Sequence, residues 1–112
     1  MAKTYQILVR INERKHDLYR NGVPYKTYPV AVGKPATPTP RGSFTIINKA
    51  FNPGGSYGSR WLGLSMTRIG IHGTNNPASI GKAASKGCIR LHNKNIEELY
   101  SLVSVGTPVR II

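Results

Sequence analysis

Cysteine and acidic residues are scarce in this sequence, which contains one cysteine, Cys88, and four Asp plus Glu residues. A single cysteine excludes an intramolecular disulfide, so cross-linking of a small domain cannot explain why Cys88 is present. The 16 Lys plus Arg residues raise the net charge to +12. This charge attracts anionic partners such as nucleic acid, anionic lipid or an acidic cell-wall polymer, but it does not choose among them.

Long apolar runs are also missing. No stretch is long enough to span a bilayer, and the first residues lack the apolar core and small-residue cleavage site of a secretory signal. We therefore expect no membrane span, and no signal peptide is visible. The basic residues are scattered from Lys3 to Arg110 without a recognisable nucleic-acid motif, so we expect no nucleic-acid partner.

The length of 112 residues, with 12 Gly and 8 Pro, predicts one domain, residues 1–112, that is rich in strands and turns. Alternating residues predict strands over 5–11 and 15–19, and Asn21-Gly22 favours a tight hairpin turn. In the return strand, over 25–32, Pro29 indicates an edge or irregular position. Further strands are expected over 43–49, 61–65, 68–72 and 109–112.

One short helix is expected near the C-terminus. Asn95 and Glu98 have the spacing of a capping box at a helix start. An apolar face follows at helical spacing, formed by Ile96, Leu99, Leu102 and Val103. The pattern as a whole predicts a mainly β protein with a single α-helix.

The segment around Cys88 has features of an activated thiol. A thiolate is the reactive form of cysteine, and cations such as Lys86, Arg90 or a protonated His72 are expected to lower the thiol pKa. Gly87 lets the backbone approach a substrate closely and leaves amide groups to face an oxyanion. From chemistry alone, an inert buried cysteine is an equal alternative.

A nucleophilic cysteine needs a base, and of three histidines His72 is best placed, at the end of an apolar run and before Gly73. His16 lies in a polar hairpin and His92 near the helix entrance. Because acids are scarce, we expect a Cys-His dyad whose imidazole is oriented by a backbone carbonyl. A zinc site using His72, Cys88 and His92 matches no usual ligand pattern, so no metal and no cofactor are expected.

Two motifs together resemble one family. His72-Gly73-Thr74 precedes Ser85-Lys86-Gly87-Cys88-Ile89-Arg90, which is similar to the H-G-T and S-x-G-C-x-R motifs of the L,D-transpeptidase catalytic domain of the YkuD type. The T-P-T-P-R-G stretch at 37–42, the Y-G-S-R-W-L segment at 57–62 and the G-T-P-V-R-I ending also resemble it. The resemblance covers nearly the whole chain, and two motifs in the right order are specific.

The resemblance implies a β-sandwich of mixed sheets that carries a cleft, with a short helix at one side. It implies that the Cys88 thiolate attacks the third stem residue of a peptidoglycan tetrapeptide, expels the terminal D-alanine and forms a thioester, which an acceptor amine resolves. His72 is then the base and later the acid, the Gly73 carbonyl holds its imidazole, and Arg90 stabilises charge in the cleft.

The resemblance also implies roles around this pair. Ser85 would buttress the histidine or cysteine loop, and amides near Gly87 and Cys88 would bind the oxyanion. Tyr57 and Trp61 are candidate walls of the donor groove, with ordinary packing as an equal alternative. Many family members carry histidine where Lys86 stands, so His72 is left as the sole base.

The resemblance implies peptidoglycan stem peptides as partners, at the cell wall or the extracellular side of a bacterial cell. The net charge leaves an anionic cell-wall polymer open as a further partner, and a monomer is expected. A carboxypeptidase or hydrolase with the same site stays open, because water can replace the acceptor amine. A basic nucleic-acid-binding module and an inactive wall-binding domain are the alternatives from other classes.

Overall fold

The computed structural model describes residues 4–66 and 68–112. Its elements are ten strands, one α-helix and two 3-10 turns, in the order β1 (Tyr5–Arg10), β2 (Lys15–Arg20), β3 (Val23–Pro29), β4 (Val32–Gly33), β5 (Gly42–Phe51), η1 (Gly55–Tyr57), β6 (Arg60–Leu64), β7 (Gly70–His72), η2 (Pro77–Ser79), β8 (Ala83–Ser85), β9 (Ile89–Arg90), α1 (Asn93–Leu102) and β10 (Pro108–Ile111). No helix in this described part of the chain is long and apolar enough to cross a membrane.

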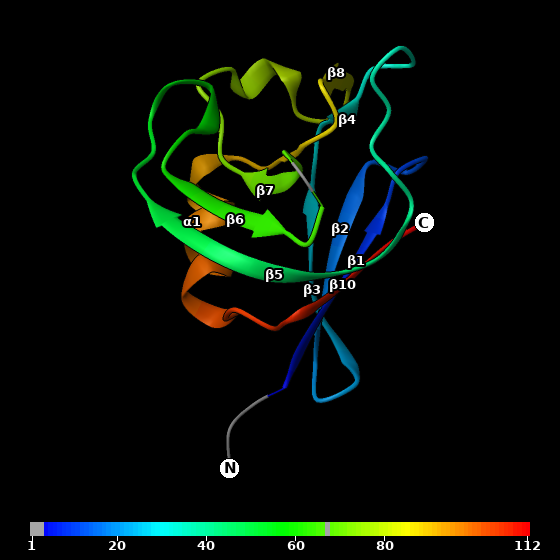
Figure 1. The fold of residues 1–112 in the computed structure, drawn as a ribbon, viewed down its shortest axis with the longest axis vertical. Coiled ribbons are helices and arrows are strands. Elements are labelled where there is room, and N and C mark those ends of the chain that lie inside the picture. The colour runs from blue at the N-terminus through cyan, green and yellow to red at the C-terminus, as the bar shows by residue number, and fades with distance from the viewer. Residues whose placement is uncertain (1–3, 67) are drawn as a thin grey trace.

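Eight of the strands form one curled, mixed sheet in the order β3-β2-β1-β10-β5-β6-β7-β9, and β4 pairs with β8 separately. The long strand β5 joins the two halves, because residues 42–45 pair with β10 and residues 46–51 pair with β6. Figure 1 shows β5 as a curved band that runs from one half to the other. The expected mainly β fold of mixed sheets with one helix near the C-terminus is confirmed.

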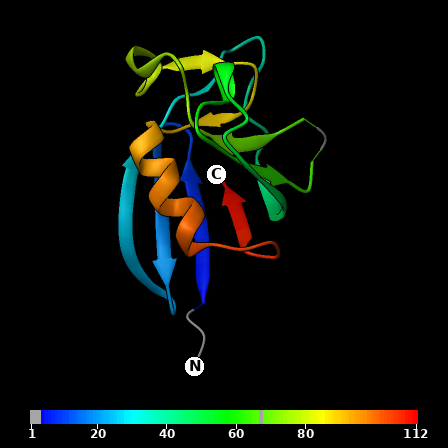
Figure 2. The same cartoon turned by 90° about the vertical axis from the view of Figure 1, so that its left-hand side faces the viewer.

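The core lies between the two halves of this sheet. Ile7, Val9 and Leu18 of the first half meet Leu62 and Ile71 of the second half in one buried cluster. The helix α1 adds the fully buried side chains of Ile96 and Leu99, as the apolar face predicted. It contacts β6 and β7, and in Figure 2 it lies in front of the first strands of the sheet. Burial of an aliphatic side chain contributes about 1.5–3 kcal/mol, so this cluster stabilises the frame that carries the site.

The first hairpin forms where the sequence predicted it. Asn21 and Gly22 have positive φ angles of 52° and 80°, the conformation that a two-residue hairpin turn requires. The return strand β3 ends at Pro29 and lies at the edge of the sheet, where the missing N–H of proline costs no ladder hydrogen bond.

The capping box predicted for α1 is wrong. The helix begins at Asn93 with His92 at the N-cap, so Asn95 already lies in the first turn. The Glu98 carboxylate instead accepts hydrogen bonds from Lys26 Nζ at 2.8 Å and Tyr28 Oη at 2.6 Å. These two donors hold the edge strand β3 against the helix and lower the pKa of Glu98.

Candidate active site

Strand pairing brings the two predicted reactive residues into one cavity. β7 runs parallel to β9 with His72 opposite Arg90, so the end of β7 lies beside the segment that carries Cys88. The cavity of about 590 Å³ is lined by Ser56, Tyr57, Arg68, His72, Ser85, Lys86, Cys88 and Arg90. Of these residues, Ser56 and Arg68 carry no role in the sequence prediction.

The His72 imidazole is buried, with 3% of its surface exposed. Its Nδ1 lies 2.5 Å from the Gly73 carbonyl oxygen. A carbonyl only accepts hydrogen bonds, so Nδ1 carries the proton and Nε2 keeps a free lone pair. Burial lowers the His72 pKa from 6.5 to about 4, although the Gly73 bond opposes the shift and Arg90 adds to it. The imidazole is therefore neutral at pH 7 and able to accept a proton.

Two aromatic rings hold this imidazole. Trp61 stacks on His72 with ring centroids 5.6 Å apart and an interplanar angle of 19°, while Tyr57 meets it edge-on at 5.1 Å. The Trp61 Nε1–H donates to Asn48 Oδ1 at 3.0 Å, which fixes the indole. Half-exposed Tyr57 lines the cavity, but Trp61 is not among the lining residues, so it supports His72 rather than forming a wall.

The Cys88 thiol is partly buried, and Sγ donates to the Arg68 carbonyl oxygen at 3.4 Å. Burial raises the Cys88 pKa, although the Gly70 N–H and the Arg90 charge lower it. We expected nearby cations to lower the pKa of Cys88. The Arg90 charge does lower it, but burial raises it by more, so the expected net decrease is wrong. The resting pair is a neutral thiol and a neutral imidazole, which requires proton transfer during attack.

The loop before Cys88 is held by Ser85, which is buried. Its Oγ donates to the Cys88 carbonyl oxygen at 2.6 Å and accepts from the Gly87 N–H at 3.1 Å. Gly87 has a φ of +122°, and a Cβ there would lie 2.9 Å from Ile69 Cδ1, so this position requires glycine. The amides of Gly87 and Cys88 were both expected to bind an oxyanion. The Gly87 N–H already donates to Ser85 Oγ, so the Cys88 N–H is the one that is left for this role.

The histidine loop depends on Asn93, which the sequence prediction missed. Asn93 Oδ1 accepts from the Ser59 and Thr74 N–H groups, both at 3.1 Å, and Nδ2 donates to the Thr74 carbonyl at 3.0 Å. A Cβ at Gly73 would lie 2.1 Å from Asn93 Oδ1. The close approach explains why glycine follows His72. An asparagine at the start of a helix belongs to no sequence motif that predicts contacts to a distant loop.

Three cations surround the thiol: Arg68, Lys86 and Arg90 line the cavity, and none of the four acids of the chain does. Arg90 donates to Ser79 Oγ at 3.4 Å, while its buried Nε has no hydrogen-bond partner among the residues that the structure describes. The cavity therefore suits an anionic ligand. Within residues 4–66 and 68–112, no group of three His, Cys, Asp or Glu side chains lies close enough to hold a metal ion.

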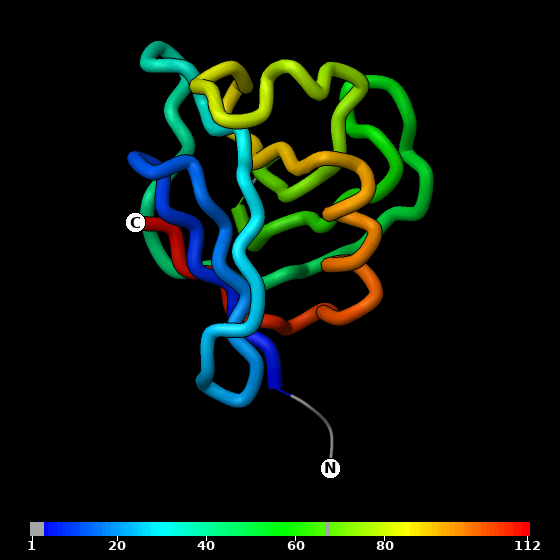
Figure 3. The backbone as a smooth tube through the Cα atoms, turned by 180° about the vertical axis from the view of Figure 1, so that it is seen from behind, coloured from blue at the N-terminus to red at the C-terminus, as the bar shows by residue number. Residues whose placement is uncertain are grey.

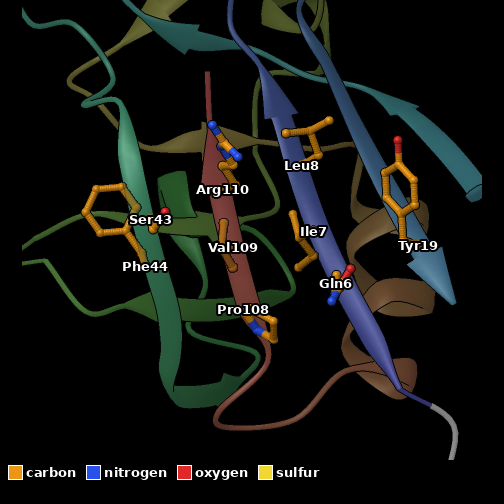
Figure 4. A pocket seen from close by; sticks show the side chains of 9 residues that line it. All are labelled: Gln6, Ile7, Leu8, Tyr19, Ser43, Phe44, Pro108, Val109 and Arg110. Atoms are coloured by element: carbon orange, nitrogen blue, oxygen red, sulfur yellow. The ribbon is translucent and has the colours of Figure 1, made fainter. Parts of the chain in front are cut away.

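Another cavity, of about 410 Å³, lies on the outer face of the sheet (Figure 4). Its lining side chains come from β1, β2, β5 and β10 and include Leu8, Tyr19, Phe44 and Arg110. Neither cysteine nor histidine lines it, so it offers no nucleophile-base pair for catalysis.

Comparison with known proteins places the chain in one family. Residues 4–111 match the family described as YkuD, the L,D-transpeptidase catalytic domain. The chain is 58% identical over 107 residues to the putative L,D-transpeptidase YkuD of Bacillus subtilis and 56% identical to that of Bacillus licheniformis; each match covers 96% of this chain and 65% of the relative. This chain therefore spans slightly less than two thirds of these relatives.

A solved structure has the same fold. The NMR structure of the catalytic domain from an Enterococcus faecium L,D-transpeptidase superposes with a TM-score of 0.84 at 27% identity, and the match covers 96% of each chain.

Proposed function

The chain belongs to the YkuD family of L,D-transpeptidase catalytic domains, and we propose that it transfers an acyl group between peptidoglycan stem peptides through a thioester on Cys88. The observation that carries the proposal is the shared cavity of Cys88 and His72, in which Nδ1 is bound to Gly73 and Nε2 is free to take a proton. The proposed place of action is the bacterial cell wall.

In the first half of the reaction, His72 Nε2 takes the thiol proton as Sγ bonds to the carbonyl carbon of the third stem residue. The negative charge moves to the carbonyl oxygen, where the Cys88 N–H donates to it. Collapse breaks the bond to the terminal D-alanine, whose amine leaves with the proton from His72. The products are free D-alanine and a thioester.

In the second half, an acceptor amine attacks the thioester carbonyl and gives its proton to His72. Collapse of the second tetrahedral intermediate breaks the C–S bond, and the proton returns to Cys88 Sγ. The new amide is the cross-link. Water in place of the amine gives the tripeptide acid instead, so the acceptor decides between transpeptidase and carboxypeptidase activity.

The three cations of the cavity fit the charge of this substrate. A stem tetrapeptide ends in a carboxylate, and Arg90, Arg68 and Lys86 are the charged groups that line the space around Cys88. The backbone of Arg90 pairs with that of Ala31, and its guanidinium donates to Ser79 Oγ. We therefore propose that this guanidinium meets the carboxylate or the developing oxyanion.

Covalent capture by a carbapenem tests the nucleophile and the base. We expect intact-mass spectrometry to show one adduct on the wild-type chain, none on Cys88→Ala, and an adduct that forms about 100-fold more slowly on His72→Ala. His92→Ala is the matched control, because His92 does not line the cavity, and it should react at the wild-type rate. A Cys88→Ala chain that still forms the adduct would overturn the proposal.

A donor tetrapeptide separates the two outcomes of the thioester. With an acceptor stem peptide present, we expect a cross-linked dimer together with D-alanine. If D-alanine and tripeptide appear and no dimer forms at any acceptor concentration, the chain is a carboxypeptidase and the transfer step is wrong.

A further inference from the structure

A second basic cavity, of about 460 Å³, shares no lining residue with the cavity of Cys88. Its walls are the turn between β1 and β2 and the proline-containing segment 34–41. The two backbone views place this turn and this segment at the same end of the molecule (Figure 1, Figure 3). The sequence prediction used residues 37–42 only as part of the family resemblance, and the proposed reaction does not use this cavity.

The charge of this cavity has one sign. Arg14, Lys34 and Arg41 line it, and none of the four acids of the chain does. The salt bridges found among the described residues use Asp17 and Glu98 for other cations. Arg14, Lys34 and Arg41 are therefore not neutralised by a carboxylate in the lining, so the cavity attracts an anion.

Arg14 is the lining cation that the fold encloses most closely. Its Nε is buried without a hydrogen-bond partner among the described residues, and a buried donor without an acceptor is costly. Its backbone also has a φ of 53°, a left-handed conformation that a non-glycine residue keeps only where the surroundings hold it. Because Nε is buried, a ligand in the cavity meets the terminal amino groups of the guanidinium, on a residue whose backbone the fold holds in place.

The chemistry of the lining favours a phosphate group. A guanidinium pairs two N–H groups with the oxygens of one phosphate, and lysine adds a point charge. The lining contains no aromatic side chain, so the stacking surface that single-stranded nucleic acids need is missing. Pro35 and Pro38 restrict the backbone of the segment that forms one wall.

We propose that the cavity of Arg14, Lys34 and Arg41 binds a phosphate group, and that this phosphate belongs to a phosphodiester polymer of the bacterial cell wall. The second statement rests on the proposed function, because a wall-modifying enzyme works among such anionic polymers. The first statement stands on the cavity alone.

The cavity is connected to the catalytic loop through segment 34–41. Thr39 Oγ1 donates to the Gly87 carbonyl oxygen at 2.8 Å, and Thr37 Oγ1 donates to the Ser85 carbonyl oxygen at 3.0 Å. A polymer held at this segment therefore places the wall beside the loop that carries Cys88. Such a second contact raises the local concentration of wall-attached stem peptides without changing the chemical step.

Calorimetric binding of a poly(glycerol phosphate) oligomer to the full chain tests the site. We expect Arg14→Gln, Lys34→Gln and Arg41→Gln each to weaken binding about tenfold. Arg14→Lys, which keeps the charge but lacks the planar guanidinium that pairs with two phosphate oxygens, should also weaken binding. Lys94→Gln removes the same charge from the surface of α1, outside the cavity, and should change binding by less than about twofold.

Inorganic phosphate and a single-stranded DNA of equal charge are the competing probes. If both probes bind more weakly than the poly(glycerol phosphate) oligomer, the assignment to a wall polymer is supported. Equal binding of either probe, with the same loss in Arg14→Gln, would overturn the polymer assignment. Equal loss in Lys94→Gln and Arg14→Gln would overturn the site itself, because the attraction would then come from the net charge.

The catalytic proposal is checked separately. Cys88→Ala should bind the oligomer as the wild type does, and Arg14→Gln should release D-alanine from a short stem peptide at the wild-type rate, because that peptide carries no phosphate. A chain that binds the oligomer but forms no thioester contradicts only the proposed function.

Discussion

The indole of Trp61 lies stacked on the imidazole of His72, with the centroids 5.6 Å apart and the planes inclined by 19°. The two residues are direct partners in the β6–β7 ladder, so the backbone pairing sets the stack. The indole covers one face of the ring, and burial is the main cause of the low His72 pKa. The pair thus connects sheet register to the protonation state of the proposed base.

Trp61→Ala should make the acylation rate more sensitive to acid. Removal of the indole exposes His72 to water, so its pKa rises from about 4 towards 6.5. A larger fraction of the base is then protonated at pH 5.5, and the rate relative to wild type should fall several-fold between pH 8 and pH 5.5. Carbapenem acylation measured across this range gives the profile.

Trp61→Phe is the matched control, since it keeps a ring over His72. Its profile should stay near that of the wild type. If Trp61→Ala slows acylation by the same factor at pH 5.5 and pH 8, the indole acts on the orientation of His72 and not on its pKa.

Ser85→Ala should loosen the loop that presents Cys88. The hydroxyl joins the Cys88 carbonyl to the Gly87 N–H, and its loss leaves a buried donor and a buried acceptor unpaired at a cost of about 1–3 kcal/mol. We expect a lower melting temperature together with slower acylation. Ser101→Ala removes an exposed hydroxyl that also bonds a carbonyl, that of Glu98, and should affect neither. Wild-type acylation by Ser85→Ala would contradict the buttress role.

Asn93→Ala should misplace the His72 loop. The lost amide makes three hydrogen bonds that hold Ser59 and Thr74, so we expect a loss of stability of about 1–3 kcal/mol and slower acylation. Asn93→Asp keeps an oxygen that accepts from both N–H groups and should be affected less. Melting curves and acylation rates are compared with those of Asn95→Ala, two positions along the helix.

If Asn93→Ala is less stable but is acylated at the wild-type rate, Asn93 holds the fold and does not position the base.

Local patterns predicted the first hairpin and indicated the candidate residues of the site. The Asn21-Gly22 turn and the first hairpin depend on adjacent residues, and two short motifs marked Cys88 and His72. The Glu98 contact could not be predicted in this way, because its partner Lys26 lies 72 positions away in the sequence. A capping box is a local pattern, and it failed here because the helix begins at Asn93, before Asn95.

The direction of the Cys88 pKa shift and two short strands were also not predicted. The sign of the Cys88 pKa shift depends on how deeply the fold covers the thiol, and cations counted along the sequence do not show this. The strands β4 and β9 have two residues each, too few for any alternation to be recognised. Each forms by pairing with a strand that lies elsewhere in the sequence, β4 with β8 and β9 with β7.

His16 should make the fold sensitive to acid. The side chain is fully buried against Tyr28, and neither ring nitrogen has a hydrogen-bond partner in the described part of the chain. Burial, although Asp17 opposes it, lowers the His16 pKa from 6.5 to about 4. Between these values the unfolded chain binds more protons than the folded chain, so stability is full above pH 6.5 and falls as the pH decreases towards 4.

At pH 5, His16 lowers the free energy of unfolding by about 2 kcal/mol relative to pH 7.5. Buried His72 lowers it further, because its pKa is shifted in the same direction. Urea unfolding at both pH values measures the difference. His16→Leu keeps an apolar side chain of similar size at this site and should reduce the pH dependence, whereas His92→Ala, outside the core cluster, should not. An NMR titration in which His16 ionises near pH 6.5 would show that the core does not keep this ring neutral.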